Sequence, residues 1–115
     1  MYEYNAKVIK IVDGDTVDAL IDIGFSVWVQ KRIRLYGINT PESRTRDLVE
    51  KKAGLAAKEQ LKSWIEENDN KIRIKSHGVG KYGRCLGEIY TEGDESLNKQ
   101  LVKLGHAVEY FGGAR

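Results

Sequence analysis

Cysteine and proline are almost absent from this 115-residue sequence, which has one residue of each. The single Cys85 cannot close an intrachain disulfide, and no His or Cys stands beside it at zinc-ligand spacing. We therefore expect Cys85 to be a small buried packing residue in a protein that fits a reducing compartment. Long apolar runs are missing too, so the sequence predicts no membrane span.

The segment after Met1 lacks the basic and apolar stretches of a signal peptide. We therefore expect a cytoplasmic protein, and a phage or mobile-element gene is compatible with its small size. The length fits a single domain over residues 1–115 that can bury its own core.

An excess of one charge is also missing, because 19 basic and 17 acidic residues leave a net charge of only +2. That value alone does not indicate nucleic-acid binding. Basic residues nevertheless gather in two short segments, residues 31–34 and 71–75, and acidic residues gather elsewhere. Such zones favour a polyanion beside a cation site, with solvated strand and helix faces as the alternative interpretation.

The first third of the chain has the two-residue period of β-strands. Apolar residues alternate with polar ones over 16–23, and Asp13-Gly14 before them is a strong hairpin turn. We predict three strands, over 6–12, 16–23 and 27–38. In the third strand, Arg32 and Arg34 face one way and Ile33 and Leu35 the other.

The remainder predicts a helix, two strands and a second helix. The first helix, over 52–68, has a stripe of Ala53, Ala57, Leu61 and Ile65. Strands are expected over 71–75 and 85–90, and a helix over 97–104 with Ser96 as its N-cap. This order predicts an α+β fold of mainly β structure, in which a five-stranded OB-type Greek-key barrel carries two helices.

Oxygen-bearing side chains follow the first turn and the third strand. Asp15, Asn39 and the carbonyl of Thr40 form an all-oxygen set that suits a hard divalent cation, and no soft ligand competes. Asp13-Gly14 can also be an ordinary turn, and Glu42 a solvated loop acid. Because Pro41 fixes the local geometry, Asn39 and Glu42 are expected to point in defined directions.

Basic residues suited to phosphate come from two places. Arg34 lies on the polar face of its strand, where a surface salt bridge is the alternative interpretation. The glycine-rich loop at 78–84 presents Lys81, Tyr82 and Arg84, which could hold a phosphate by charge and hydroxyl contacts.

Four segments in this order resemble the staphylococcal nuclease (thermonuclease) family along nearly the whole chain. They are Val12-Asp13-Gly14-Asp15-Thr16, Arg34 to Glu42, Lys81-Tyr82-Gly83-Arg84, and Leu97 to Gly105. The resemblance implies calcium-dependent hydrolysis of DNA, RNA or both, with water attacking the phosphate and leaving 3′-phosphate ends. Single-stranded substrate, a monomeric enzyme and no membrane partner are expected, and Mn²⁺ or Mg²⁺ are alternative cations.

The resemblance also assigns roles by position. Asp15, Asn39 and the Thr40 carbonyl would bind the metal, and Asp13 would lie near it. The catalytic residues would be Glu42, which positions or deprotonates water, together with Arg34 and Arg84, which bind the scissile phosphate. Substrate-binding residues would be Lys81 and Tyr82 on a neighbouring phosphate and Tyr110 stacking on a base, with core packing as the alternative for the Tyr110 ring.

Two departures from the family pattern qualify these roles. Asn39 stands where the family typically has a second calcium-binding aspartate, so we expect weaker or altered metal binding. The sequence stops about ten residues after Gly105, so the family's third helix is expected to be missing. The alternative function is a weak or inactive OB module that binds single-stranded nucleic acid or a protein.

Overall fold

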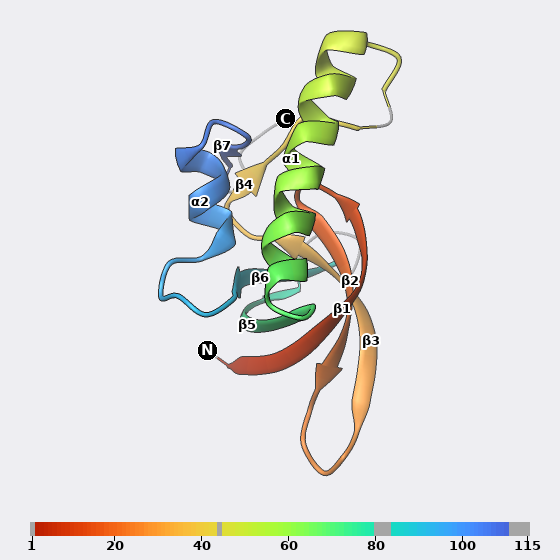
Figure 1. The fold of residues 1–115 in the computed structure, drawn as a ribbon. Coiled ribbons are helices and arrows are strands. Elements are labelled where there is room, and N and C mark those ends of the chain that lie inside the picture. Colours follow the sequence, from red (N-terminus) through yellow and green to blue (C-terminus); the bar gives the residue numbers. More distant parts are fainter. Residues whose placement is uncertain (1, 44, 80–83, 111–115) are drawn as a thin grey trace.

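Five strands form a closed barrel in the computed structural model, which describes residues 2–43, 45–79 and 84–110 (Figure 1). The strands are β1 (Glu3–Asp13), β2 (Thr16–Asp22), β3 (Trp28–Leu35), β5 (Lys71–Val79) and β6 (Cys85–Tyr90). Their order around the barrel is β1-β2-β3-β6-β5, and β3 and β6 run parallel while the other neighbours are antiparallel. Because β5 also pairs with β1, the sheet has no free edge.

The barrel interior is apolar because inward residues alternate with outward ones along each strand. Val17 pairs with Ile33 and both are buried, whereas the next pair, Asp18 with Arg32, faces outward. The core also includes Ala19, Ile72, Ile74 and Ile89 from the strands. Cys85 is half-buried and packs against this core, so it is less enclosed than the sequence suggested.

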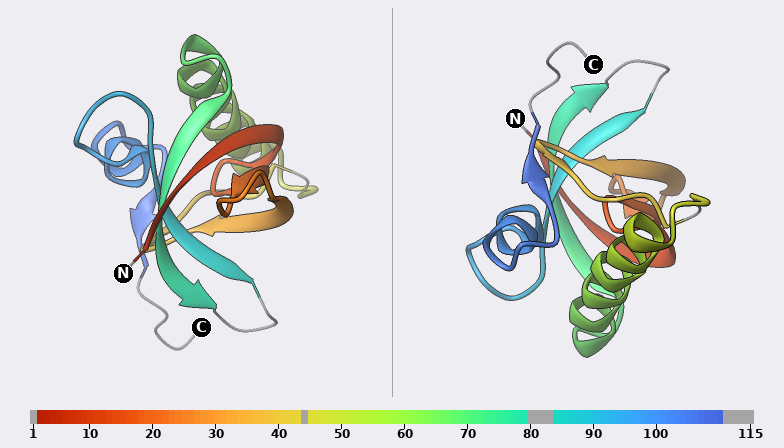
Figure 2. Two further views of the ribbon diagram at one scale, coloured as in Figure 1. Left: turned by 90° about the horizontal axis from the view of Figure 1, so that it is seen from below. Right: turned by 90° about the horizontal axis from the view of Figure 1, so that it is seen from above.

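Helix α1 (Leu48–Glu67) lies outside the barrel (Figures 1 and 2). Its Leu61 and Ile65 are part of the barrel's apolar core. Asp47 caps its first turn by accepting hydrogen bonds from the amides of Val49 and Glu50. The helix therefore begins four residues earlier than position 52. Its buried positions are Gly54, Ala57, Leu61 and Ile65. The expected place of Ala53 in the stripe is wrong, because Ala53 is exposed and Gly54 occupies the buried position.

A turn splits the predicted third strand. Strand β3 ends at Leu35, Gly37 adopts a φ of 79°, and the short β4 (Ile38–Asn39) then pairs with β7 (Val108–Glu109) outside the barrel. Glycine suits this turn because other residues rarely adopt a positive φ. The turn therefore directs the segment after β3 away from the barrel wall.

Helix α2 (Leu97–Lys103) is anchored by its cap and by a buried amide. Ser96 accepts a hydrogen bond from the amide of Lys99, which confirms the predicted N-cap, and Gly105 has a φ of 80°. Asn98 donates to the carbonyls of Tyr36, at 2.8 Å, and Gly87, at 3.1 Å, and accepts from the amide of Ile89. Asn98 thus ties α2 to the turn after β3.

The predicted fold class is confirmed: a mainly β, OB-type barrel with two helices in the described ranges. The β4–β7 pair is an addition that the sequence did not indicate. Neither helix has the length and apolarity to span a bilayer in the part of the chain that the structure describes.

Candidate active site

The turn between β1 and β2 packs against the middle of α1 and carries Asp15. Gly14 is buried beneath α1, and a Cβ there would lie 2.8 Å from the Cβ of Ala57. The turn therefore needs glycine for close packing. The side chain of Asp15 points inward: the residue is only 8% exposed, and its Oδ2 accepts a hydrogen bond from the amide of Thr40 at 3.1 Å. A buried carboxylate requires such partners.

The segment 39–43 after β3 is called the corner below. Arg34 links Asp15 to this corner. Its Nη1 lies 3.3 Å from Oδ2 of Asp15, and its Nη2 donates to Oδ1 of Asn39 at 3.1 Å. Nη1 also donates to the carbonyl of Leu35. The Arg34 side chain is only 15% exposed, so solvent screens this arrangement poorly. Arg34 is thus a partly buried cross-link rather than the surface salt bridge considered as its alternative.

The corner that carries Glu42 rests on a glycine of α1. A Cβ at Gly54 would lie 2.6 Å from the backbone carbonyl carbon and oxygen of Glu42 and from the carbonyl oxygen of Pro41. The amide of Glu42 donates to Oε1 of Glu50 at 3.4 Å, and the Glu42 side chain is exposed. The helix therefore fixes the backbone of the corner and leaves the Glu42 carboxylate accessible.

Asp13 lies beside the same corner. Its Oδ1 accepts a hydrogen bond from the hydroxyl of Ser43, which is buried. This contact joins the β1–β2 turn to the residue after Glu42. Asp13 therefore holds the corner through the Ser43 hydroxyl.

The remaining predicted residues lie along the next strands or outside the description. Arg84 is exposed and directly precedes Cys85, whose partner on β3 is Ile33, so its backbone lies beside the strand that carries Arg34. Tyr110 is half-buried, and its amide donates to the carbonyl of Gly37. Lys81 and Tyr82 lie outside the described residues. The structure thus brings Asp15, Arg34, Asn39 and Thr40 into direct contact and sets Glu42 and Arg84 on adjoining segments.

A cation can be accommodated at this corner by the donor set that is present. Asp15, Asn39 and Thr40 supply oxygen atoms, and the buried Oγ1 of Thr40 has no hydrogen-bond partner within the described part of the chain. No group of three His, Cys, Asp or Glu side chains gathers in a metal-binding arrangement among the described residues. The set therefore fits a hard cation, but with one direct carboxylate its negative charge is low.

Sequence reasoning missed Gly54 and an aromatic cluster beside the site. The rings of Tyr36 and His77 are stacked with centroids 3.9 Å apart, and Nε2 of His77 lies 2.7 Å from Oε1 of Glu88. Tyr90 donates to the other Glu88 oxygen at 3.2 Å. Burial raises the pKa of Glu88, but the hydrogen bonds from His77 and Tyr90 outweigh it and leave the pKa below its usual value.

The sequence carries a signal for Gly54 but none for the contacts of the aromatic cluster. A glycine inside a helical pattern often marks a close backbone approach, so Gly54 could have been found. The cluster joins side chains from β5, β6 and the turn after β3, and residue spacing carries no sign of such contacts.

Comparison with known proteins adds family information to this geometry. The profile of a family described as staphylococcal nuclease homologue matches residues 32–114. The chain is 31% identical over 115 residues to "Endonuclease YhcR" of Bacillus subtilis, covering 95% of this chain and 9% of that protein. It is 28% identical over 109 residues to "Thermonuclease" of Staphylococcus hyicus, covering 95% and 61%.

An archaeal relative has a similar extent of match. "Uncharacterized protein MJ1439" of Methanocaldococcus jannaschii is 30% identical over 129 residues, covering 94% of this chain and 60% of that protein. The chain therefore spans less than two thirds of the length of each of these relatives.

Proposed function

The chain belongs to the staphylococcal nuclease homologue family, and on that premise we propose that it hydrolyses phosphodiester bonds in DNA, RNA or both with a hard divalent cation. Relatives named endonuclease and thermonuclease support this activity class. Calcium is the proposed cation, and 3′-phosphate ends are the proposed products.

One observation carries the proposal: Arg34 contacts both Asp15 and Asn39 at a single corner of the barrel. A carboxylate, a carboxamide and a guanidinium from three segments thus converge where the Thr40 amide also binds Asp15. Metal-dependent hydrolysis of a phosphodiester needs an acidic cation site next to a basic group that holds the phosphate. The corner holds a carboxylate and a guanidinium in contact, which supports the proposal.

Asp15, Asn39 and the carbonyl of Thr40 would hold the cation. When bound, such a cation supplies positive charge that polarises a phosphoryl oxygen and lowers the cost of an incoming oxygen nucleophile. Since Asn39 contributes no charge, Asp15 is the main anionic ligand. We propose that affinity for calcium is correspondingly weak, which would limit cleavage where free calcium is scarce.

Glu42 acts as general base in this proposal. Its carboxylate is exposed while its backbone is held against Gly54, so it can reach a water molecule from a fixed position. The water oxygen forms a bond to phosphorus, Glu42 takes its proton, and the bond from phosphorus to the 5′-oxygen breaks. The 5′-oxygen takes a proton from solvent and leaves as a hydroxyl, Glu42 returns its proton to solvent, and the phosphate stays on the 3′-oxygen.

Arg34 and Arg84 hold the phosphate and its growing negative charge. Arg34 is already oriented by its contacts to Asp15, Asn39 and the Leu35 carbonyl, so little reorganisation is needed. The planar guanidinium fork matches two phosphoryl oxygens. Lys81 and Tyr82 are proposed to bind the adjacent phosphate, and Tyr110 to contact a base.

A second function is favoured by the same contacts. Arg34 already neutralises Asp15 and binds Asn39, so these two side chains are paired without a cation. A module that binds single strands without cutting them is therefore the alternative. Such a module would bind single strands tightly, and a chelator would leave that binding unchanged.

Digestion of a 5′-labelled single-stranded oligonucleotide separates the two functions. Purified protein is incubated with calcium, with manganese and with chelator, and product ends are tested for removal of a 3′-phosphate by a phosphatase. We expect cleavage with calcium, none with chelator, and phosphatase-sensitive 3′ ends. Binding without cleavage under all three conditions would favour the module and contradict the nuclease.

A further inference from the structure

A basic pocket with one aromatic wall lies on the outer face of the barrel, below the end of α1. It has a volume of about 420 Å³ and is lined mainly by side chains of β1, β3, β5 and the residue after α1. The polar and aromatic lining residues used here are Asn5, Lys7, Trp28, Asn68, Lys71 and Arg73. That volume is enough for one nucleotide.

Three cations line this pocket, and one of them, Lys7, lies over the aromatic ring. Nζ of Lys7 lies 5.6 Å from the ring centroid of Trp28, which is 43% exposed. Lys71 pairs with Lys7 across β1 and β5, so the two ammonium groups share one face. Arg73 is held in place by the carbonyls of Thr91 and Gly93, at 3.2 and 2.8 Å.

Among the residues that line the pocket, the three cations are accompanied by one acid, Glu92. Outside the lining, Glu3 lies 3.7 Å from Nη1 of Arg73, and Asp22 is the β2 partner of Trp28. The ring and the lysines therefore offer a stacking surface beside positive charge. This combination suits a nucleobase with its adjoining phosphates, because stacking is independent of sequence and the phosphates bind lysine.

One strand connects this pocket to the candidate active site. The outer face of β3 carries Arg34, Arg32, Gln30 and Trp28, whose partners on β2 are Thr16, Asp18, Leu20 and Asp22. From Arg34 to Trp28 is six residues, about 20 Å of extended strand. Between them, Arg32 is paired with Asp18 through two hydrogen bonds, at 2.8 and 3.2 Å.

We propose that the Trp28 pocket is a second binding site for single-stranded nucleic acid, which holds a segment of the substrate away from the bond that is cut. The inference rests on the proposed function and specifies its substrate: a strand long enough to reach from Arg34 along β3 to Trp28. Bases of a single strand are free to stack, whereas those of a duplex are already stacked on each other. A short oligonucleotide at the corner leaves the pocket empty.

The test measures binding rather than cleavage. Glu42→Gln is used as the parent to prevent cutting, and fluorescence anisotropy follows a labelled trinucleotide and a labelled 12-mer over a range of salt. Trp28→Ala is expected to weaken 12-mer binding about fivefold or more, and Trp28→Phe much less. Lys7→Gln with Lys71→Gln should lower the slope of log affinity against log salt by about 1.4, from about 0.7 per lost phosphate contact.

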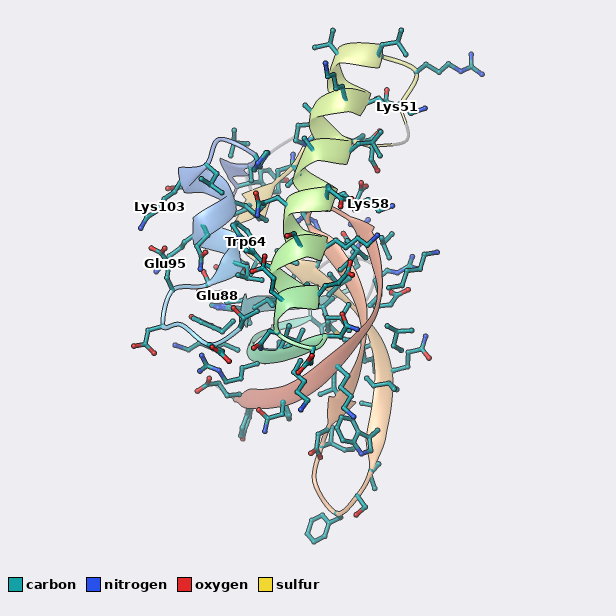
Figure 3. The ribbon with its side chains drawn as sticks, in the orientation of Figure 1. Lys51, Lys58, Trp64, Glu88, Glu95 and Lys103 are labelled. Atoms are coloured by element: carbon teal, nitrogen blue, oxygen red, sulfur yellow. The ribbon has the colours of Figure 1, made fainter. Side chains whose placement is uncertain are left out.

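A matched variant controls for general loss of charge. Lys62→Gln with Lys103→Gln removes two exposed lysines elsewhere, and Lys103 lies on α2, away from the β2–β3 hairpin (Figure 3). That variant should bind both oligonucleotides like the parent, and trinucleotide binding should be unchanged in every pocket variant. Circular dichroism confirms that each variant is folded.

The outcomes separate the pocket from the nuclease. Equal 12-mer affinity in parent and pocket variants would overturn the inference while leaving the nuclease intact, as would an equal loss for the trinucleotide. Pocket-dependent binding by a wild-type protein that cuts nothing would support the inference and contradict the proposed function.

Discussion

Arg34 and Asp15 form a partly buried ion pair, with Nη1 of the guanidinium 3.3 Å from Oδ2 of the carboxylate. Their side chains are only 15% and 11% exposed, so the pair is weakly screened by water. A cation that binds Asp15 must do so beside this positive charge. The charge on the neighbouring position 39 therefore decides how well the corner can hold both a cation and Arg34.

Asn39→Asp should tighten calcium binding several-fold. The substitution restores a second anionic ligand at the corner and gives Arg34 a second carboxylate partner at the place where it now binds an amide. Calorimetric titration of both proteins measures the change. The control is Asn70→Asp, which adds the same charge in the turn after α1, where a φ of 61° suits either residue. Affinity that is unchanged or weaker in Asn39→Asp would count against the metal assignment.

Gly54→Ala should reduce cleavage at least tenfold although alanine is the better helix former. Propensity alone would stabilise α1 by about 1 kcal/mol. The added Cβ, 2.6 Å from the Glu42 and Pro41 backbone, should cost about 1–3 kcal/mol and displace the corner. Small displacements of a catalytic group reduce rates strongly.

The exposed neighbour of Gly54 provides the control. Ala53→Gly weakens the same helix by about 1 kcal/mol without touching the corner, so it should cleave normally. Urea unfolding and cleavage rates are measured for both variants. Normal cleavage by Gly54→Ala would show that this contact does not position Glu42.

The hydrogen bonds that Glu88 accepts from His77 and Tyr90 should make the stability of the fold depend on pH. The pKa of Glu88 is lower in the folded protein than its usual value of 4.5, since hydrogen bonds from His77 and Tyr90 outweigh the effect of burial. Its contribution is therefore complete above pH 4.5 and is lost as the pH falls through the lower folded value. Glu88→Gln should be less stable than wild type by about 1 kcal/mol at pH 7, with the difference shrinking below pH 4.5.

Urea titrations at pH 7, 5 and 3 measure this difference. Glu66→Gln, which removes an exposed helix ion pair with Lys62, should change stability by less than about 0.5 kcal/mol at every pH. A deficit of Glu88→Gln that is the same at pH 3 and pH 7 would be inconsistent with the lowered pKa.

The strands and helices could be predicted where one short segment carries its own signal. The alternation of Val17, Ala19 and Ile21 fixes which face of β2 is buried, and Ser96 marks the start of α2. The first four residues of α1 were missed because Leu48 and Val49 are exposed and leave no buried stripe, although Asp47 caps them. Helix formation there depends on the cap rather than on packing.

The contents of the corner were predictable, but its contacts were not. Asp15, Arg34 and Asn39 are candidates from the sequence, yet the hydrogen bond from Arg34 to Asn39 depends on where the turn at Gly37 places β4. Likewise, the Tyr36–His77 stack joins residues 41 positions apart through the barrel's order of strands. Such pairs depend on tertiary structure and leave no periodic pattern.

Single-turnover cleavage of a labelled oligonucleotide by wild type, Glu42→Ala and Arg84→Ala tests the proposed mechanism most directly. Both side chains are exposed, so neither change should unfold the barrel, and thermal unfolding verifies this. Glu59→Ala, on the exposed side of α1, is the control. We predict that each catalytic variant cleaves about a hundredfold or more slowly with calcium while the control matches wild type. Near-normal cleavage by either folded variant would contradict the account.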